Sequence, residues 1–197
     1  MLRLLMSSVL LFFCGLILAG CSNEGKKEMT AEEMVKRGEY LVTFGGCNDC
    51  HTPKTFGPQG MDIDKSKMLS GHSQDAELPT FDTAMVKPGN WYLANSHLTA
   101  WVGPWGISYT ANLTPDGPTG LGNWTSEIFI KAMRSGLHMG TGRQILPPMP
   151  WMMINKLTDE DLKAVFAYLQ SLPPVRNQVP EPVAPNALAS FRTAAAK

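Results

Sequence analysis

The sequence predicts an all-α domain with about three main helices and long irregular loops. Three segments carry helix-start residues followed by apolar residues at helical spacing. Between the first and second segments lie about eighty residues that are dense in Gly, Pro, Asn and Asp. No run in that stretch alternates long enough to predict a sheet, although residues 105–111 are compatible with a short pairing.

The first helix is expected from Thr30 to about Phe44. Thr30 followed by Glu33 matches a capping box, in which two side chains satisfy free N–H groups at the helix start. Gly45 and Gly46 should end the helix, because glycine is a poor helix former and favours turns. One face of this helix carries Met34, Gly38 and Leu41.

The second helix should begin after Trp124, with Thr125 or Ser126 as its N-cap, because short hydroxyl side chains satisfy the free N–H groups of a first turn. Gly136 should end it, since glycine readily adopts the left-handed conformation that closes a helix. The inward face is expected to carry Phe129, Ala132 and Met133.

The third helix has the clearest pattern. Thr158 is its expected N-cap, with Asp161 three residues later. Pro173 and Pro174 should stop it, because proline lacks the backbone N–H that a helix interior needs. Apolar residues recur at i, i+3, i+4 and i+7, namely Leu162, Val165, Phe166 and Leu169. This spacing lines one face of the helix and predicts that the face is buried.

The N-terminal segment has the features of an export signal rather than a membrane span. Arg3 provides a positive charge, and an apolar run ends in small residues just before Cys21. The tetrad Leu-Ala-Gly-Cys at 18–21 resembles the lipobox of bacterial lipoproteins, in which the cysteine is acylated. An ordinary signal peptide or an uncleaved anchor helix is the alternative. We therefore expect residues 1–20 to be a removed signal and residues 21–29 a polar tether.

The rest of the chain has the length of one domain, expected at residues 30–175. A Pro- and Ala-rich tail, residues 176–197, should be extended over the surface or mobile. The sequence holds 17 basic and 17 acidic side chains without a basic stripe, so nucleic acid is not an expected partner. No Ser-His-Asp pattern or phosphate-binding loop is apparent, which argues against the usual hydrolytic or phosphoryl-transfer chemistry.

The stretch GGCNDCHTP, residues 45–53, is the strongest functional motif. Its C-x-x-C-H spacing is compatible with haem attachment, a redox disulfide or half of a zinc site. Of the four cysteines, Cys14 leaves with the signal and Cys21 is expected to carry lipid. Only Cys47 and Cys50 then remain, in an oxidising setting where unprotected thiols rarely survive.

Haem attachment explains this motif best. A zinc site needs four ligands, and no second C-x-x-C is present. A thioredoxin-like pair would need a βαβ setting, which the sequence does not predict. Haem needs two thiols for thioether links and a histidine for iron, and Cys47, Cys50 and His51 supply all three from one short segment.

Met149, in the stretch LPPMPWMMI at 146–154, is the candidate for the second axial ligand. Flanking prolines restrict its backbone to a stiff, non-helical conformation, which reduces the entropy lost in placing a sulfur over iron. Methionine opposite histidine also suits electron transfer. The alternative is that these methionines fill gaps in the core, which we expect of Met152 and Met153.

Taken together, these features resemble a class I c-type cytochrome. The blocks ANLTPDGPTGLGNWT, GTGRQILPPMPW and LTDEDLKAVFAYLQSLPP are similar, more narrowly, to the cytochrome domains that serve bacterial membrane-bound alcohol and aldehyde dehydrogenases. The resemblance covers roughly residues 35–175 and implies a cytochrome c-like fold around one covalent haem c. Several relatives carry two or three haem domains, whereas this chain has a single C-x-x-C-H.

The resemblance implies further contacts. The first and third helices should cross closely at Gly38, and His51 should donate its second N–H to a carbonyl, for which Pro58 is the candidate. Contacts to the haem propionates are expected from Arg143, Asn112, Thr114 and Trp124. The alternative for the NLTPD block is turn chemistry alone.

These features predict an electron carrier rather than an enzyme, anchored by lipid on the periplasmic side of a bacterial envelope. They leave open which membrane carries the lipid. The expected partners are a dehydrogenase, a quinol-oxidising complex or a terminal oxidase. The alternative is a haem enzyme such as a small peroxidase with an open distal face, and a gas sensor is a third hypothesis. Whether Met149 binds iron discriminates between them.

Overall fold

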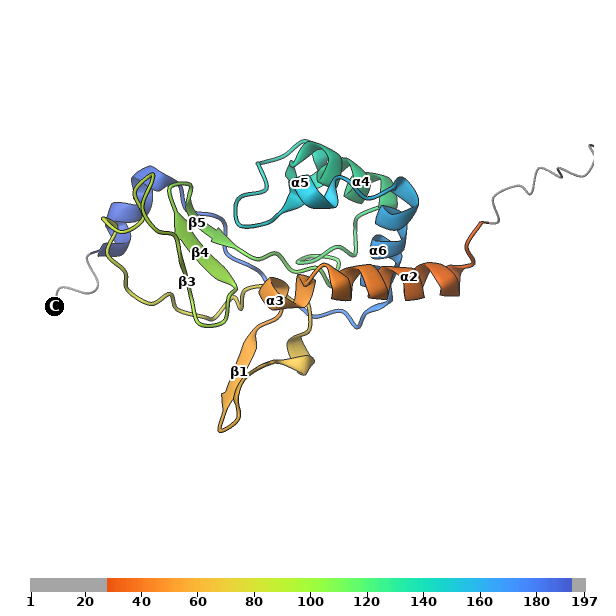
Figure 1. Cartoon of the computed structure of the whole chain (residues 1–197), viewed down its shortest axis with the longest axis horizontal. Coiled ribbons are helices and arrows are strands. Elements are labelled where there is room, and N and C mark those ends of the chain that lie inside the picture. Colours follow the sequence, from red (N-terminus) through yellow and green to blue (C-terminus); the bar gives the residue numbers. More distant parts are fainter. Residues whose placement is uncertain (1–27, 193–197) are drawn as a thin grey trace, which may run out of the picture. The chain divides into compact units, whose positions relative to one another are not determined.

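The computed structural model describes residues 28–192, so the expected signal, Cys21 and most of the tether lie outside the described residues. Its helices are α2 (Ala31–Phe44), α3 (Cys47–His51), α4 (Ser126–Ser135), α5 (Trp151–Ile154) and α6 (Asp159–Ser171) (Figure 1). Its strands are β1 (Lys54–Gly57), β2 (Gly60–Ile63), β3 (Leu93–Ala94), β4 (Ala100–Gly103) and β5 (Gly106–Tyr109). Short 3₁₀ helices occupy Lys65–Lys67, His138–Gly140 and Pro185–Arg192. Within this range no helix combines the length and apolarity needed to cross a bilayer.

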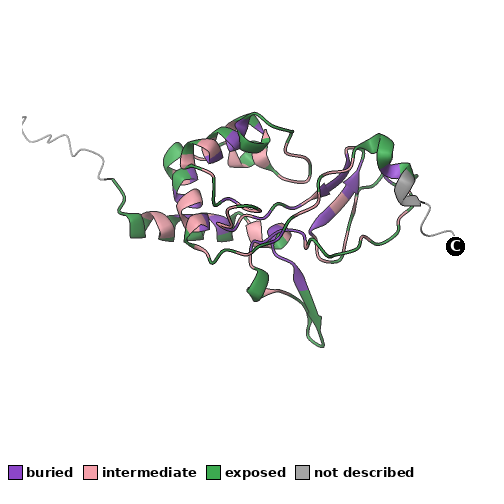
Figure 2. Cartoon of the chain, turned by 180° about the vertical axis from the view of Figure 1, so that it is seen from behind, coloured by how far each residue is buried: buried purple, intermediate pink, exposed green. Residues whose placement is uncertain are grey.

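The predicted all-α fold class is wrong, because the described residues include two small antiparallel sheets. β1 and β2 form a hairpin directly after α3, and its tip is exposed (Figure 2). In the second sheet β4 lies between β3 and β5, with Val102 opposite Ile107. These strands have four residues or fewer, too few for the alternation of side chains to stand out in the sequence.

The three predicted main helices form the first hydrophobic core, with α2 and α4 both packed against α6. The crossing of α2 and α6 is close, since a Cβ at Gly38 would lie 1.9 Å from the carbonyl oxygen of Ala164. The expected close crossing at Gly38 is therefore confirmed. The buried residues of this core are Val42, Leu69, Leu121, Phe129, Ala132, Met133, Leu162, Val165 and Leu169.

The expected helix boundaries are confirmed at α4 and α6. The hydroxyl of Thr125 caps α4 by accepting a hydrogen bond from the N–H of Ile128, and Gly136 closes the helix with a φ of 68°. The hydroxyl of Thr158 caps α6 by accepting from the N–H of Asp161 at 3.1 Å. Each cap depends on residues within one helical turn, which is why the sequence predicts it.

The second hydrophobic core lies between the β3–β5 sheet and the C-terminal segment, and its buried residues are Val86, Val102, Ile107 and Leu188. Val183 and Ile107 exchange two backbone hydrogen bonds of 2.9 and 3.0 Å. Asn177 is buried, and its amide donates to the carbonyl oxygens of Ser70 and His72 at 2.7 and 2.8 Å. The segment expected to be an extended or mobile tail therefore contributes buried residues to the fold.

Candidate haem-binding site

The C-x-x-C-H motif forms the short helix α3 immediately after α2. Gly46, at the start of α3, has a φ of 63°, a left-handed conformation that glycine adopts without a Cβ clash. This turn ends α2 and begins α3 within two residues. Cys47 and Cys50 are three residues apart in a helix, so their side chains lie on the same face. The local fold can therefore present both thiols to one partner, as haem attachment requires.

His51 is buried, and a backbone carbonyl sets the orientation of its ring. Nδ1 lies 2.8 Å from the carbonyl oxygen of Ala111. A carbonyl oxygen only accepts hydrogen bonds, so Nδ1 carries the proton and Nε2 keeps the lone pair that iron needs. Burial lowers the pKa of this imidazole and favours its neutral form. The expectation that the carbonyl oxygen of Pro58 accepts this bond is wrong, because Nδ1 bonds to Ala111 instead. Pro58 lies in the turn between β1 and β2.

Lys54 stabilises the end of α3 in a way that the residue patterns did not predict. Its ammonium donates to the carbonyl oxygens of Asn48, Asp49 and Thr52 at 3.3, 2.8 and 2.5 Å. The last carbonyls of a helix lack partners within the helix, so a lysine just beyond the end satisfies them. The hydroxyl of Thr52 donates to Asn48 Oδ1 and accepts from the N–H of Leu69. The sequence feature that could have predicted this contact is a basic residue shortly after the C-x-x-C-H motif.

The two thiols are half-buried, and their pKa values differ from those of reactive cysteines. Burial raises the pKa of the Cys47 thiol to about 11 and also raises the pKa of the Cys50 thiol. Both thiols are therefore protonated at neutral pH, unlike the low-pKa thiols of redox-active pairs. Residues 28–192 also contain no group of three or more His, Cys, Asp and Glu side chains that could hold a metal ion. The raised pKa values disfavour the redox-disulfide interpretation.

Met149 lies in a loop that we call the ligand strap, residues 146–150, in which the Pro147–Pro148 bond is cis. Its side chain is half-buried against the first hydrophobic core. Cys47 packs against the same core. The tertiary structure thus brings the predicted sixth ligand and the C-x-x-C-H helix to one core, although they are far apart in the sequence.

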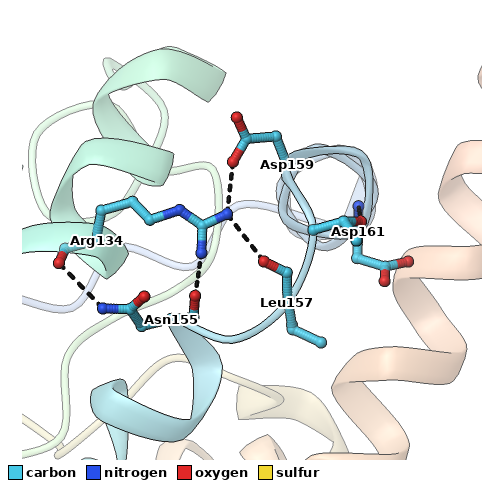
Figure 3. A network of polar contacts seen from close by, with 6 residues as sticks. Arg134, Asn155, Leu157, Asp159 and Asp161 are labelled. Atoms are coloured by element: carbon cyan, nitrogen blue, oxygen red, sulfur yellow. Dashed lines mark hydrogen bonds and ion pairs between the residues drawn. The ribbon is translucent and has the colours of Figure 1, made fainter.

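Arg134, on α4, ties the segment after the strap to the end of that helix (Figure 3). Its guanidinium donates to the carbonyl oxygens of Asn155 and Leu157 and pairs with the carboxylate of Asp159 at 2.5 Å. The side-chain amide of Asn155 donates to the carbonyl oxygen of Arg134 at 3.1 Å. These bonds hold residues 155–159, a few residues after the strap, against α4.

The competing methionines are more exposed than Met149. Met152 and Met153 on α5 are 65% and 72% exposed, and Met139 is 43% exposed. The expectation that Met152 and Met153 pack inward is therefore wrong. Of these four methionines, Met149 is the one that packs against the first core, and this difference favours it as the sulfur ligand.

Asn112 and Thr114, expected at the haem propionates, make their hydrogen bonds within the chain. The amide of Asn112 donates to the Thr119 hydroxyl and to the carbonyl oxygen of Val175 at 3.2 and 2.8 Å. Its Oδ1 accepts from the N–H and the hydroxyl of Thr114 at 3.0 and 2.7 Å. These bonds fit the alternative in which the block is a turn, and the propionate role stays a prediction.

Trp124 and Arg143, the other two propionate candidates, also contact protein groups. Trp124 packs against the first core and meets His138 edge to face, with ring centroids 5.2 Å apart. Arg143 forms an exposed ion pair of 3.5 Å with Glu181. Such exposed pairs add little stability, so this contact does not exclude another anionic partner for Arg143. Its role at a propionate also stays a prediction.

The donor set on these elements fits a haem c. Two thiols lie on one helical face, and the bond to Ala111 leaves His51 Nε2 available as a ligand. A thioether lies against the same core. Histidine and methionine are the axial ligands typical of c-type cytochromes.

Comparison with known proteins agrees with this geometry. A family model described as Cytochrome c matches residues 35–173. One chain of the nicotinate dehydrogenase of Pseudomonas putida is 30% identical over 147 residues, a match that spans 75% of the present chain and 9% of that protein.

Two further relatives come from Gluconobacter. The fructose dehydrogenase cytochrome subunit of Gluconobacter japonicus is 29% identical over 154 residues, which span 75% of this chain and 24% of that protein. The cytochrome c subunit of the quinone alcohol dehydrogenase of Gluconobacter oxydans is 28% identical over 153 residues, which span 76% of this chain and 24% of that protein. The chain therefore spans a quarter or less of the length of these curated relatives.

Proposed function

Because the chain belongs to the cytochrome c family, we propose that it is a lipid-anchored electron carrier of the bacterial cell envelope whose iron is bound by His51 and Met149. Family membership rests on the match over residues 35–173. As a member of this family, the chain binds haem c covalently and transfers electrons instead of converting a substrate.

We assign haem attachment to Cys47 and Cys50 and axial ligation to His51 and Met149. The observation that carries this assignment is the buried imidazole of His51, whose Nδ1 is bonded to Ala111 and whose Nε2 is left for iron. Haem supplies a reversible one-electron change when bound, and a methionine ligand raises its reduction potential. The half-buried position of Met149 on the first core supports the second axial role.

The proposed electron donor is a dehydrogenase. Support comes from the names of the relatives, which are components of nicotinate, fructose and quinone alcohol dehydrogenases. In those proteins the matched region is a small part of a longer chain. A quinol-oxidising complex or a terminal oxidase would complete the electron path.

The proposed location is the periplasmic side of the envelope, reached through a lipid on Cys21. The Leu-Ala-Gly-Cys tetrad at the end of the apolar run supports this anchor. Residues 22–29 would then form a short polar tether between the lipid and the cytochrome domain.

Substitution of the sixth ligand tests the electron-carrier proposal. Oxidised c-type cytochromes with His–Met ligation show a weak long-wavelength charge-transfer band from sulfur to iron. We expect this band in the wild type and its loss in Met149→Ala, together with a lower reduction potential, because the thioether that favours reduced iron is absent. Absorbance spectroscopy and a redox titration measure both effects.

Met152→Ala and Met153→Ala are the matched controls, since these side chains are exposed on α5. Both variants should keep the band and the wild-type potential. A band that persists in Met149→Ala would refute the assigned ligand. Rapid binding of peroxide or cyanide by the wild type would instead support an open distal face and an enzymatic function.

A further inference from the structure

The ligand strap is bonded to the second sheet. The hydroxyl of Ser108, on β5, donates to the carbonyl oxygen of Pro147 at 2.6 Å. Ser108 is 7% exposed, so water cannot readily replace this bond. Pro147 is two residues before Met149, and the bond therefore restrains the strap directly beside the proposed ligand.

The Ser108 hydroxyl is itself oriented by Trp105. The indole Nε1–H of Trp105 donates to Ser108 Oγ at 3.1 Å. The Trp105 ring lies close to the strand backbone, because a Cβ at Gly103 would be 2.5 Å from ring atoms of Trp105. With one bond accepted and one donated, the hydroxyl proton is directed toward Pro147. We call this chain of hydrogen bonds, Trp105–Ser108–Pro147, the strap relay.

The sheet that carries the relay is anchored in the second hydrophobic core. Ile107 is fully buried in the second core and exchanges two backbone hydrogen bonds with Val183. Side chains alternate between the two faces of a strand, so Ser108 lies on the opposite face from Ile107. One face of β5 is therefore fixed in the second core, while the other contacts the strap.

We infer that Trp105 and Ser108 are positioning residues for the sixth ligand, and that they set how often the Met149 sulfur leaves the iron. The inference rests on the proposed function, because it requires Met149 to be that ligand. Without the relay the Pro147 carbonyl loses its partner, and the strap opens more readily. The β3–β5 sheet thus helps to keep the iron six-coordinate, as an electron carrier requires, and closed to external ligands.

Displacement of the methionine by imidazole measures this opening. Imidazole binds the iron after the sulfur has left, so the binding rate at saturating imidazole reports how fast the strap opens. Ser108→Ala should raise this rate about fivefold, the factor that corresponds to a typical net loss of one hydrogen bond. Trp105→Phe should raise it by a smaller factor, because the serine remains but loses its orienting donor. Ser108→Thr keeps a hydroxyl and should remain near the wild-type rate.

Ser70→Ala is the matched control. The Ser70 hydroxyl is also buried and donates to a backbone carbonyl, that of Lys67, at 2.8 Å, but it does not contact the strap. Ser70→Ala should leave the rate of imidazole binding unchanged, even if it lowers the free energy of unfolding as much as Ser108→Ala does. A purely structural role of Ser108 predicts equal rates in Ser108→Ala and Ser70→Ala, and that result would overturn the inference.

Failure of the relay and failure of the proposed function give different results. A wild type without the charge-transfer band refutes Met149 ligation, and the inference falls with it. A wild type that has the band, with no change of rate in Ser108→Ala, refutes the relay alone. If Ser108→Ala does not fold, Trp105→Phe decides the question, because an unchanged imidazole rate in that variant contradicts the relay.

Discussion

At the scale of single residues, backbone carbonyls contribute to the site as much as side chains do. The ring of His51 is oriented by the carbonyl oxygen of Ala111, and Lys54 binds three carbonyl oxygens at the end of α3. The ligand strap is held through the carbonyl oxygen of Pro147. Any residue type supplies a carbonyl, so these contacts leave little trace in residue identity.

Covalent attachment is tested at the two thiols. Cys47→Ser and Cys50→Ser each remove one thioether, so each variant should keep haem through the remaining link. The double variant should lose its haem during acid–acetone extraction, because no covalent bond remains. Mass spectrometry of the extracted protein measures the outcome. Haem that extracts freely from the wild type would contradict covalent attachment.

At the scale of elements, the crossing of α2 and α6 shapes the first core. The backbones approach so closely that the Cβ position of Gly38 is 1.9 Å from a carbonyl oxygen and 2.7 Å from the Cβ of Tyr168. The ion pair of 2.8 Å between Arg37 and Asp161 links the same two helices at the surface. Only two residues separate the end of α2 from the start of α3, so a shift of α2 would also move the C-x-x-C-H motif.

Gly38→Ala should therefore destabilise the protein, although alanine usually favours a helix. The added methyl group collides with backbone atoms of α6, which cannot rotate away. We expect the free energy of unfolding to fall by about 1–3 kcal/mol, the usual range for overpacking a core. Denaturant unfolding followed by tryptophan fluorescence measures the change.

Gly57→Ala serves as the control, because a Cβ at Gly57 would meet no atom within 4 Å. Its free energy of unfolding should stay close to that of the wild type. Equal stability of Gly38→Ala and Gly57→Ala would show that the α2–α6 crossing relaxes without cost, contrary to the close contact described above.

At the scale of the whole molecule, the two hydrophobic cores together hold the proposed iron ligands in position. The first core carries α3 and one side of the ligand strap, and the second core supports the sheet that binds the strap through Ser108. Asn177 joins the C-terminal segment to the carbonyl oxygens of Ser70 and His72. The C-terminal segment is therefore part of the folded domain and stabilises the residues around the site.

The membrane anchor is a property of the whole protein. Cys21→Ala should release the protein into the soluble fraction after a salt wash while haem binding remains, because the lipid is separate from the haem site. One acyl chain binds membranes only marginally, so stable anchoring requires the several chains of a lipoprotein cysteine. Cell fractionation with haem staining measures the distribution. Cys14→Ala, a change within the expected signal, should leave the protein on the membrane, and a wild type recovered in the soluble fraction would refute the anchor.

The sequence by itself determined α2, α4 and α6, the caps at Thr125 and Thr158, and the C-x-x-C-H motif. These features depend on residues within one helical turn, so their physical causes lie within a short stretch of sequence. Met149 stood out for a related reason, because its flanking prolines restrict the backbone locally.

Only the tertiary structure decided the two small sheets, the Ala111 acceptor and the contact of Ser108 with the strap. Strands of two to four residues are stabilised by their partners and by burial rather than by their own pattern. The partners of His51 and Pro147 are about sixty and forty residues away in the sequence, and a backbone carbonyl carries no residue signature. Such contacts form only when the packing of the two cores brings distant segments together, and local sequence patterns do not encode that packing.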